Sequence, residues 1–590
     1  MHAEATTNLP RNAARRGWRH ASAAVVLALL AACGGSGGGP DAAPADLPAS
    51  RAEAARFLAQ ATFGPTESAI DRVMTLGYAA WIDEQVALPQ TLHRSYWDAE
   101  NAAIKAADAS RSAGSRQVLD SFYQQAIHGE DQLRQRVAFA LSQIFVVSMQ
   151  DGNVGNAMRG VPAYLDMLGK HGFGSYRRLI EQVARSPVMG MYLSHLGNMK
   201  EDPARGRVPD ENFAREVMQL FSIGLYELDP EGRARLGSDG KPIETYDAND
   251  VAALARVFTG WSYNGPDTAD SRFYGWDAAT QDPARLISPM QGYSQFHSLA
   301  AKTFLGKTVA AQTRADPEAS LKVALDTLAR HPNVGPFIGR QMIQRLVTSN
   351  PSPAYVQRVA QAFDAGGSEN MLAMVRAILL DPEARDPARA ADPAFGKLRE
   401  PVLRLTTLLR AFAATSDSGK FLVGTTSDNA TQLGQTPLSA PSVFNFYRPG
   451  YVPPNTSAAA AGMVAPEMQI THETTVAGYA NFMRYGIQYG FGQYGEDWSA
   501  KRPDVQLAFD AEAALAGKPR ELVAQVAGRL LGQAAPKALE DEIAAAVASI
   551  DIPARQPGGA NADAIAGARR NRVLTAVLLT LVSPEFLIQK

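Results

Sequence analysis

The sequence predicts a mainly α-helical globular protein with long ordered loops and one small β-hairpin. Apolar residues recur at the three- and four-residue spacing of an amphipathic helix from Ser50 almost to Lys590. The alternating pattern that is typical of strands is nearly absent. Apolar residues make up 46% of the 590, which is enough to bury a full core. No fixed-period repeat recurs, which disfavours a solenoid.

The N-terminus is typical of an export signal. Four arginines between residues 11 and 19 precede an apolar stretch from Ala21 to Ala32. That stretch is too short to cross a hydrocarbon core of about 30 Å, but it suits a signal peptide. It ends in Leu30-Ala31-Ala32-Cys33, which resembles the bacterial lipobox. We therefore expect residues 1–32 to be a lipoprotein signal peptide and Cys33 to be acylated. An ordinary signal peptide with an incidental cysteine is the alternative.

The segment after Cys33 predicts how the domain is attached. Residues 33–49 are rich in glycine, proline and alanine, which is typical of a flexible tether. A helical domain follows over residues 50–590, and a division into two subdomains near 265–300 is an open alternative. These features predict a lipid-anchored protein of the bacterial cell envelope, at the periplasmic face or the outer membrane.

Charge and cysteine usage exclude several classes of protein and site. The formal net charge is −2, and no long run of lysine or arginine occurs, so nothing supports nucleic-acid binding. Cys33 is the single cysteine. An intramolecular disulfide and a cysteine-built metal site are therefore excluded.

Helices are predicted along nearly the whole domain. The first covers residues 54–64 and ends at Gly64, a residue suited to a helix terminus. The Ser186-Pro187 step divides the segment 175–194 into two helices. The other clear helical patterns lie at 131–148, 247–261, 317–331, 334–349, 354–365, 370–384, 396–413 and 571–589.

Between these helices, one hairpin and three long loops are expected. The hairpin is predicted over residues 226–246, where strand-like stretches flank turn residues. The loops are rich in aromatic residues, glycine or proline. Long ordered loops are common places for binding sites, and a surface coil pinned by its aromatic residues is the alternative. The loops cover residues 262–296, 415–460 and 485–500.

Charged residues surround a short apolar helix between Pro209 and Glu227. Asp210 is expected to cap the N-terminus of this helix, and Glu211 in the first turn favours the helix dipole. Gly224 lies where the helix should stop. The buried face is expected to consist of Phe213, Val217, Leu220 and Phe221. A helix cap, a buried apolar face and an ion pair are enough to explain the whole segment as a structural element.

The same helix also supports a functional interpretation. Glu211 and Arg215 stand four residues apart, as do Asn212 and Glu216, so the members of each pair can touch. If the face that carries Asn212 and Glu216 is buried, its charge needs a partner such as Arg256 or a bound cation.

Two later segments contribute further candidates. Asp250 and Arg256 lie on the next predicted helix, which the hairpin could bring antiparallel to the first. Carboxylates without cysteine suit Ca²⁺ or Mg²⁺, although no EF-hand or HExxH spacing is present. A structural polar network, a metal or ligand site, and acid–base catalysis are the three interpretations. His297, followed by Lys302, could act as a base or a metal ligand, or could simply cap a helix.

Several segments in order resemble the domain-of-unknown-function (DUF) 1800 family. The resemblance covers about Arg51 to Lys590, and it implies a large, mostly helical, exported bacterial protein without an established activity. Genes of this family often lie beside those of the DUF1501 family, so a DUF1501 protein is an expected partner. The segments are AARFLAQATFGPT, LRQRVAFALSQIFVVS, PDENFAREVMQLFSIGLYEL, DVAALARVFTGW, APSVFNFYRPGY and SPEFLIQ.

The leading hypothesis is a lipid-anchored envelope protein that acts as a binding or assembly partner. The alternative is a metal-assisted hydrolase or related enzyme in which Glu211, Glu216, Asp250 and His297 converge on one pocket. The sequence identifies no cofactor, and a divalent cation fits the carboxylates. The candidate polar site comprises Asp210, Glu211, Asn212, Arg215, Glu216, Asp250, Arg256, His297 and Lys302.

Overall fold

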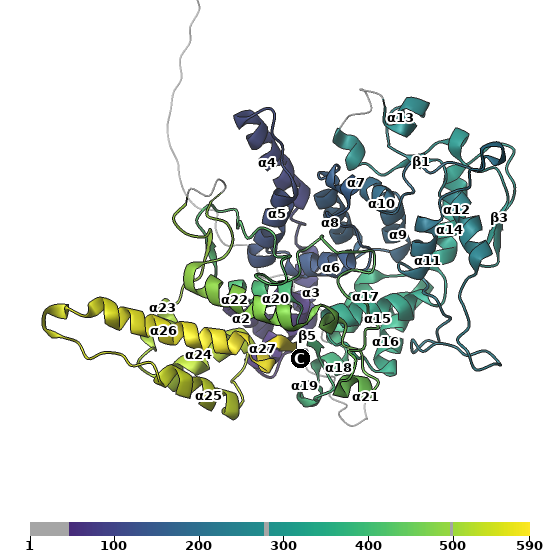
Figure 1. The fold of residues 1–590 in the computed structure, drawn as a ribbon. Helices are drawn as coiled ribbons and strands as arrows, with labels where there is room; N and C mark the ends of the chain where they lie inside the picture. Colours follow the sequence, from purple (N-terminus) through teal and green to yellow (C-terminus); the bar gives the residue numbers. More distant parts are fainter. Residues whose placement is uncertain (1–45, 277–282, 368, 496–499) are drawn as a thin grey trace, which may run out of the picture. The chain divides into compact units, whose positions relative to one another are not determined.

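The computed structural model describes residues 46–276, 283–367, 369–495 and 500–590 (Figure 1). The predicted signal peptide, Cys33 and the tether up to residue 45 lie outside these ranges. Asp46–Lys590 form one compact unit, and the described residues near 265–300 lie within it. Among the described helices, none combines the length and the apolarity that crossing a membrane requires.

Helices begin where the sequence supplies caps, and the mainly α-helical prediction is confirmed. Ser50 accepts a hydrogen bond from the Glu53 amide at the start of α1 (Arg51–Ala61). Asp316 does the same for α14 (Pro317–Ala329), where a proline in the first turn also favours initiation. Local signals of this kind fix helix positions without help from the rest of the chain.

The first part of the chain supplies the helices that surround α6 (Gln132–Ser142). Every residue of α6 except Arg134 is buried, because α6 packs against helices from several parts of the chain. The other helices before residue 260 are α2 (Glu67–Leu76), α3 (Tyr78–Ala87), α4 (His93–Ala107), α5 (Ser115–His128), α7 (Gly152–Gly155), α8 (Gly160–His171), α9 (Tyr176–Ala184), α10 (Pro187–Tyr192), η1 (Pro203–Arg205), α11 (Asn212–Gln219) and α12 (Ala248–Val257).

The rest of the chain adds a central group of helices and a C-terminal group. The yellow α26 runs alongside α24 and α25 (Figure 1). The bounds are α13 (Asp270–Tyr274), η3 (Pro283–Leu286), η4 (Ser294–Phe296), α15 (Val334–Leu346), α16 (Pro353–Asp364), η5 (Ala365–Gly367), α17 (Met371–Leu380), α18 (Pro382–Arg385), α19 (Pro387–Ala391), α20 (Pro401–Ala411), α21 (Ser457–Ala460), η6 (Pro466–Ile470), α22 (Glu473–Tyr489), α23 (Asp510–Ala514), α24 (Pro519–Leu531), α25 (Lys537–Ala548), η7 (Pro557–Gly559), α26 (Ala562–Leu581) and α27 (Pro584–Leu587).

The described strands are short and form antiparallel pairs. The hairpin predicted over 226–246 consists only of isolated bridges, because its chain turns back twice instead of once. A regular hairpin lies instead at residues 302–309. The pairs are β1 (Trp261–Ser262) with β2 (Gln291–Gly292), β3 (Lys302–Phe304) with β4 (Lys307–Val309), β5 (Lys397–Leu398) with β8 (Ile588–Gln589), and β6 (Thr415–Ser416) with β7 (Val505–Gln506).

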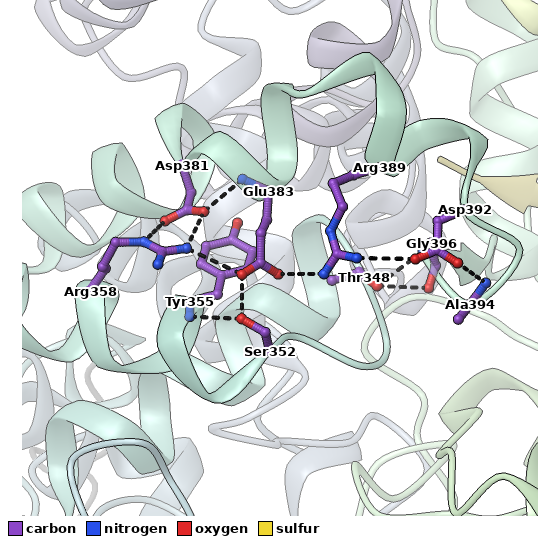
Figure 2. A network of polar contacts seen from close by, with 10 residues as sticks. All are labelled: Thr348, Ser352, Tyr355, Arg358, Asp381, Glu383, Arg389, Asp392, Ala394 and Gly396. Atoms are coloured by element: carbon purple, nitrogen blue, oxygen red, sulfur yellow. Dashed lines mark hydrogen bonds and ion pairs between the residues drawn. The ribbon is translucent and has the colours of Figure 1, made fainter.

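A polar network fastens the segment that leads into β5 (Figure 2). Arg358 donates to both carboxylate oxygens of Asp381, at 2.7 and 2.8 Å. Glu383 lies between Arg358 and Arg389 and bonds both, at 3.2 and 3.5 Å. Thr348 exchanges hydrogen bonds with the Gly396 backbone, just before β5. These contacts fix the position of the chain just before β5.

Candidate functional site

The acidic end of α11 is a cap on the protein surface. The prediction that Asp210 is the cap residue is wrong by one position: Glu211 precedes the first helical residue. Asp210 still accepts a hydrogen bond of 2.8 Å from the Asn212 amide, as an aspartate does in a local turn. Glu211 and Arg215 form the expected pair at 3.3 Å, and both side chains are about half exposed.

Glu216, in contrast, is buried, and its Oε2 has no hydrogen-bond partner among the described residues. Burial raises the pKa of this carboxyl, against a smaller opposing effect of Arg215. The expected contact with Asn212 is not formed within the described structure, because the side-chain amide of Asn212 lies 3.4 Å from the Ser194 hydroxyl instead. The partner expected in Arg256 is also engaged elsewhere, since Arg256 donates to the Ala301 carbonyl at 3.3 Å.

Asp250 joins two elements rather than lining a pocket. One of its oxygens accepts from the Asp247 amide at 2.9 Å, which closes a capping box at the start of α12. The other accepts from the Leu305 amide at 2.8 Å, in the turn of the β3–β4 hairpin. Both oxygens are therefore used by backbone donors.

His297 and Lys302 are buried and bonded to the backbone. The Nδ1 of His297 lies 2.8 Å from the Thr259 carbonyl, and burial lowers the pKa of the ring to about 4, so the imidazole is neutral at pH 7. Lys302 donates to the Ser298 carbonyl at 2.8 Å, and burial lowers its pKa too. His297 thus holds the interior together, which differs from the expected alternative of a helix cap.

The predicted polar site therefore does not assemble into one pocket. Its carboxylates make separate structural contacts in different parts of the molecule, and one oxygen of Glu216 makes none with the residues that the structure describes. Over the described ranges, no three His, Cys, Asp or Glu side chains lie close enough together to hold a metal ion.

A cavity of about 590 Å³ lies elsewhere, where four distant stretches of chain meet. The end of α6 contributes Gln143 and Ile144, and the residues after α11 contribute Leu220 and Leu225. One side of α15 and the loop 443–450 complete the wall. This volume is in the range of small-molecule sites, which are concave and mostly apolar with a few placed polar groups.

A close contact shapes one wall of this cavity, and an ordered loop forms another. The chain beyond α11 bends at Gly224, which has φ of +72°. A Cβ at this position would lie 2.8 Å from the ring of Phe337, so glycine lets this apolar wall form. Residues 417–456 contain no helix or strand, and Thr426 and Thr436 bond this long loop to itself. The loop prediction for 415–460 therefore includes one wall of the cavity.

Three buried glutamines line the cavity with incompletely bonded amides. Gln143 donates to Glu400 at 2.6 Å, and Gln344 donates to two carbonyls, which fixes both amides. Their Oε1 atoms have no partner among the described residues, and the same is true of the Nε2 of Gln341. An unbonded buried amide atom costs roughly 1–3 kcal/mol.

A cluster of buried charges lies next to the cavity, centred on Glu400. Its Oε2 accepts hydrogen bonds from Gln143, from Gln435 at 2.7 Å and from Tyr447 at 3.0 Å. Burial acts to raise the pKa of Glu400, but the neighbouring cations Lys397, Arg136 and Arg345 outweigh it and leave the pKa below its ordinary value.

The cations of this cluster are tied to the backbone and to a second carboxylate. Lys397 and Glu467 form an ion pair of 3.0 Å with both side chains buried. Lys397 and Arg136 also donate to the same carbonyl, that of Arg345, at 2.9 and 2.6 Å. Arg345 lines the cavity and stacks on the Tyr447 ring at 4.6 Å. The cluster therefore forms a rigid, charged support behind one part of the cavity wall.

Neither this cluster nor the cavity was predicted from the sequence, although the segments of the family resemblance contain some of the wall residues. Gln143, Leu220 and Phe444 belong to three of the segments that carry the family resemblance. Lys397 and Glu400 lie in a segment predicted only as a helix. The available signal was that charged residues stand at the start of an otherwise apolar segment. Such a placement is unusual in a buried segment, because charged side chains are seldom buried.

Comparison with known proteins gives a family and no activity. A model of the family described as "Protein of unknown function (DUF1800)" matches residues 56–588. No curated protein and no solved structure matches the chain significantly. Because the match covers nearly the whole chain, as the sequence resemblance predicted, the protein belongs to the DUF1800 family.

Proposed function

We propose that this protein acts by binding, and that the cavity between α6, α15 and the loop 443–450 is its binding site. The observation that carries the proposal is the cavity itself, about 590 Å³ in volume, whose mostly apolar wall also carries arginine and glutamine side chains. Concave, mostly apolar cavities with a few polar groups are the usual places where proteins bind small molecules.

We further propose that the binding domain is lipid-anchored in the bacterial cell envelope. The support is the sequence alone: an apolar segment ends at Cys33, the single cysteine, and a tether follows it. Cys33→Ser should release the protein from membranes, because each buried CH₂ of an acyl chain contributes about 0.8 kcal/mol. Membrane fractionation with labelled fatty acid checks this. Unlabelled wild-type protein in the soluble fraction would contradict it. A DUF1501 protein is the proposed partner of the anchored domain.

The hydrolase alternative requires Glu211, Glu216, Asp250 and His297 to share a pocket. In the described structure they have separate places: a surface pair, a buried position on α11, a capping box and a buried backbone contact. The proposed site is therefore the cavity and not these four residues.

The binding proposal can be tested with the neutral fluorophore N-phenyl-1-naphthylamine. Its fluorescence should rise saturably on mixing with the full mature protein, because apolar side chains dominate the cavity wall. Val443→Trp places a larger side chain in the wall and should abolish most of the signal. Val476→Trp, at an exposed position on α22 away from the cavity, is the matched control. No saturable signal, or equal signals from the two variants, would refute the proposal.

A further inference from the structure

Three arginines line the cavity, while no aspartate or glutamate does. Arg340 and Arg345 come from α15, and Arg448 comes from the loop opposite. The neighbouring cluster adds two more cations, Arg136 and Lys397, against two carboxylates. Positive charge is thus in excess on this side of the cavity, although the formal charge of the whole chain is −2.

Arg345 is the most informative of the three. Only 3% of its surface is exposed, so its charge has lost most of its hydration. Its cation stacks on the Tyr447 ring. Across the described residues, its guanidinium makes no hydrogen bond and no ion pair within 4 Å, although it lies near enough to Glu400 to lower the pKa of that carboxyl. A buried guanidinium without acceptors is costly unless a ligand supplies them.

The other two arginines have similarly unused donors. Arg448 lies over the Phe444 ring at 4.4 Å, and the described structure gives its guanidinium no hydrogen-bond acceptor. Arg340 is exposed, and no described residue accepts a hydrogen bond from it. Elsewhere in the chain, Arg358 shows the usual arrangement, in which both arms bond a carboxylate.

The apolar part of the wall indicates what else the ligand contains. Leu220, Leu225, Phe337, Val443 and Phe444 line the same cavity as the arginines. Leu225 is 47% exposed although it is a large apolar side chain, so apolar surface continues to the opening. A ligand that matched both surfaces would carry one acidic group on an apolar body.

We propose that the cavity binds an organic anion, with its carboxylate or phosphate group held by Arg340, Arg345 and Arg448. The planar guanidinium of arginine can donate two parallel hydrogen bonds to a pair of oxygens of either group. The apolar body lies against the leucine and phenylalanine side chains. This inference rests on the proposed binding function and identifies the chemical class of its ligand.

Two fluorophores with the same skeleton test the anion inference separately from the proposed binding function. 8-Anilino-1-naphthalenesulfonate carries an acidic group that N-phenyl-1-naphthylamine lacks. With the mature protein, we expect the sulfonate to bind about tenfold or more tightly than the neutral compound. Equal affinities would overturn the anion inference and leave the binding function standing. Saturable binding of neither would overturn both.

Arginine variants locate the acidic group. Arg340→Gln and Arg448→Gln should each weaken sulfonate binding about tenfold and leave the affinity for the neutral compound within about twofold. Arg484→Gln, at an exposed arginine on α22, is the matched control and should change neither affinity. Unchanged sulfonate binding in both cavity variants would overturn the assignment. Neither position supports the Glu400 cluster, so both variants should fold.

Competition then distinguishes the acids. Octanoate and octyl phosphate should displace the bound sulfonate, while octan-1-ol should need about a tenfold higher concentration for the same displacement. The more effective competitor identifies a carboxylate or a phosphate as the preferred group. Displacement by octan-1-ol that equalled both acids would show that the apolar body alone is recognised, and would overturn the inference.

Discussion

The acidic end of α11 and the cavity beside α15 both concentrate charged and polar side chains, but the two regions differ in whether these side chains have hydrogen-bond partners. Around α11, Asp210, Glu211 and Asp250 each have a backbone or side-chain partner. Around the cavity, Arg345 and the glutamine amides retain unused hydrogen-bonding groups. The comparison teaches that a concentration of charge does not mark a site by itself. A concave, mostly apolar wall whose arginine side chains have no hydrogen-bond acceptor among the described residues is the more specific mark.

The largest effect should come from the apolar support of α11 and not from its charges. Phe213 stacks on the His195 ring at 3.8 Å and meets Phe258 edge-on at 4.7 Å. Phe213→Ala should lower the free energy of unfolding by about 3–5 kcal/mol, measured by urea denaturation. Leu220→Ala should cost less than about 2 kcal/mol, because this side chain is only half-buried at the cavity wall. Equal costs would contradict the structure of this stripe.

A slightly smaller effect is expected on the cavity side. Glu400→Gln removes the carboxylate that faces Arg136, Arg345 and Lys397, and should cost about 3 kcal/mol, since buried cations are left uncompensated. The surface counterpart, Glu211→Gln, should cost less than about 1 kcal/mol. Urea midpoints of the two variants check the difference. A loss at Glu211 as large as that at Glu400 would remove the contrast between the two regions.

Asp250 tests whether the acidic region is structural. Asp250→Ala should cost about 1–2 kcal/mol, because two backbone amides lose their acceptor. Glu542→Ala, at an exposed position on α25, should change stability by less than about 0.5 kcal/mol. Thermal melts of the wild type and Asp250→Ala should respond identically to EDTA, Ca²⁺ and Mg²⁺. An ion-dependent shift that the variant loses would restore the metal-site interpretation.

The smallest effect concerns Glu216, and its sign depends on pH. Burial raises the pKa of this carboxyl in the folded state, so the folded protein holds the proton more tightly than the unfolded chain. The wild type should therefore lose stability as the pH rises from about the ordinary value of 4.5 through the raised value. Glu216→Gln should lack this loss and be the more stable protein at pH 7. A less stable variant at pH 7 would indicate a cationic partner.

The sequence allowed helices to be predicted because their signals are local. Apolar spacing placed α14 and α15 correctly, since periodicity and capping act within a few residues. The end of α11 was harder: the chain unwinds after Gln219 and turns only at Gly224. Tertiary contact with Phe337 decides that course, and it has no local signature.

The cavity could not be predicted for a related reason. Gln143, Gln344 and Phe444 are separated by long stretches of sequence and meet only in the folded chain. On α15, Gln341 and Arg345 look like the solvated side of an amphipathic helix. Whether such a side chain is exposed or buried depends on elements that pack over it. The acidic residues near α11 were conspicuous for the opposite reason, because their local capping roles concentrate charge in one short stretch.

The pairing of β5 with β8 has a consequence for the order of folding. Residues 397–398 pair with residues 588–589. The strand from the middle of the chain therefore cannot pair until a strand near the C-terminus has been synthesised. During synthesis, β5 cannot pair with β8 until about 190 further residues have emerged. Refolding followed by hydrogen exchange should show β5 gaining protection late, together with α26 and α27.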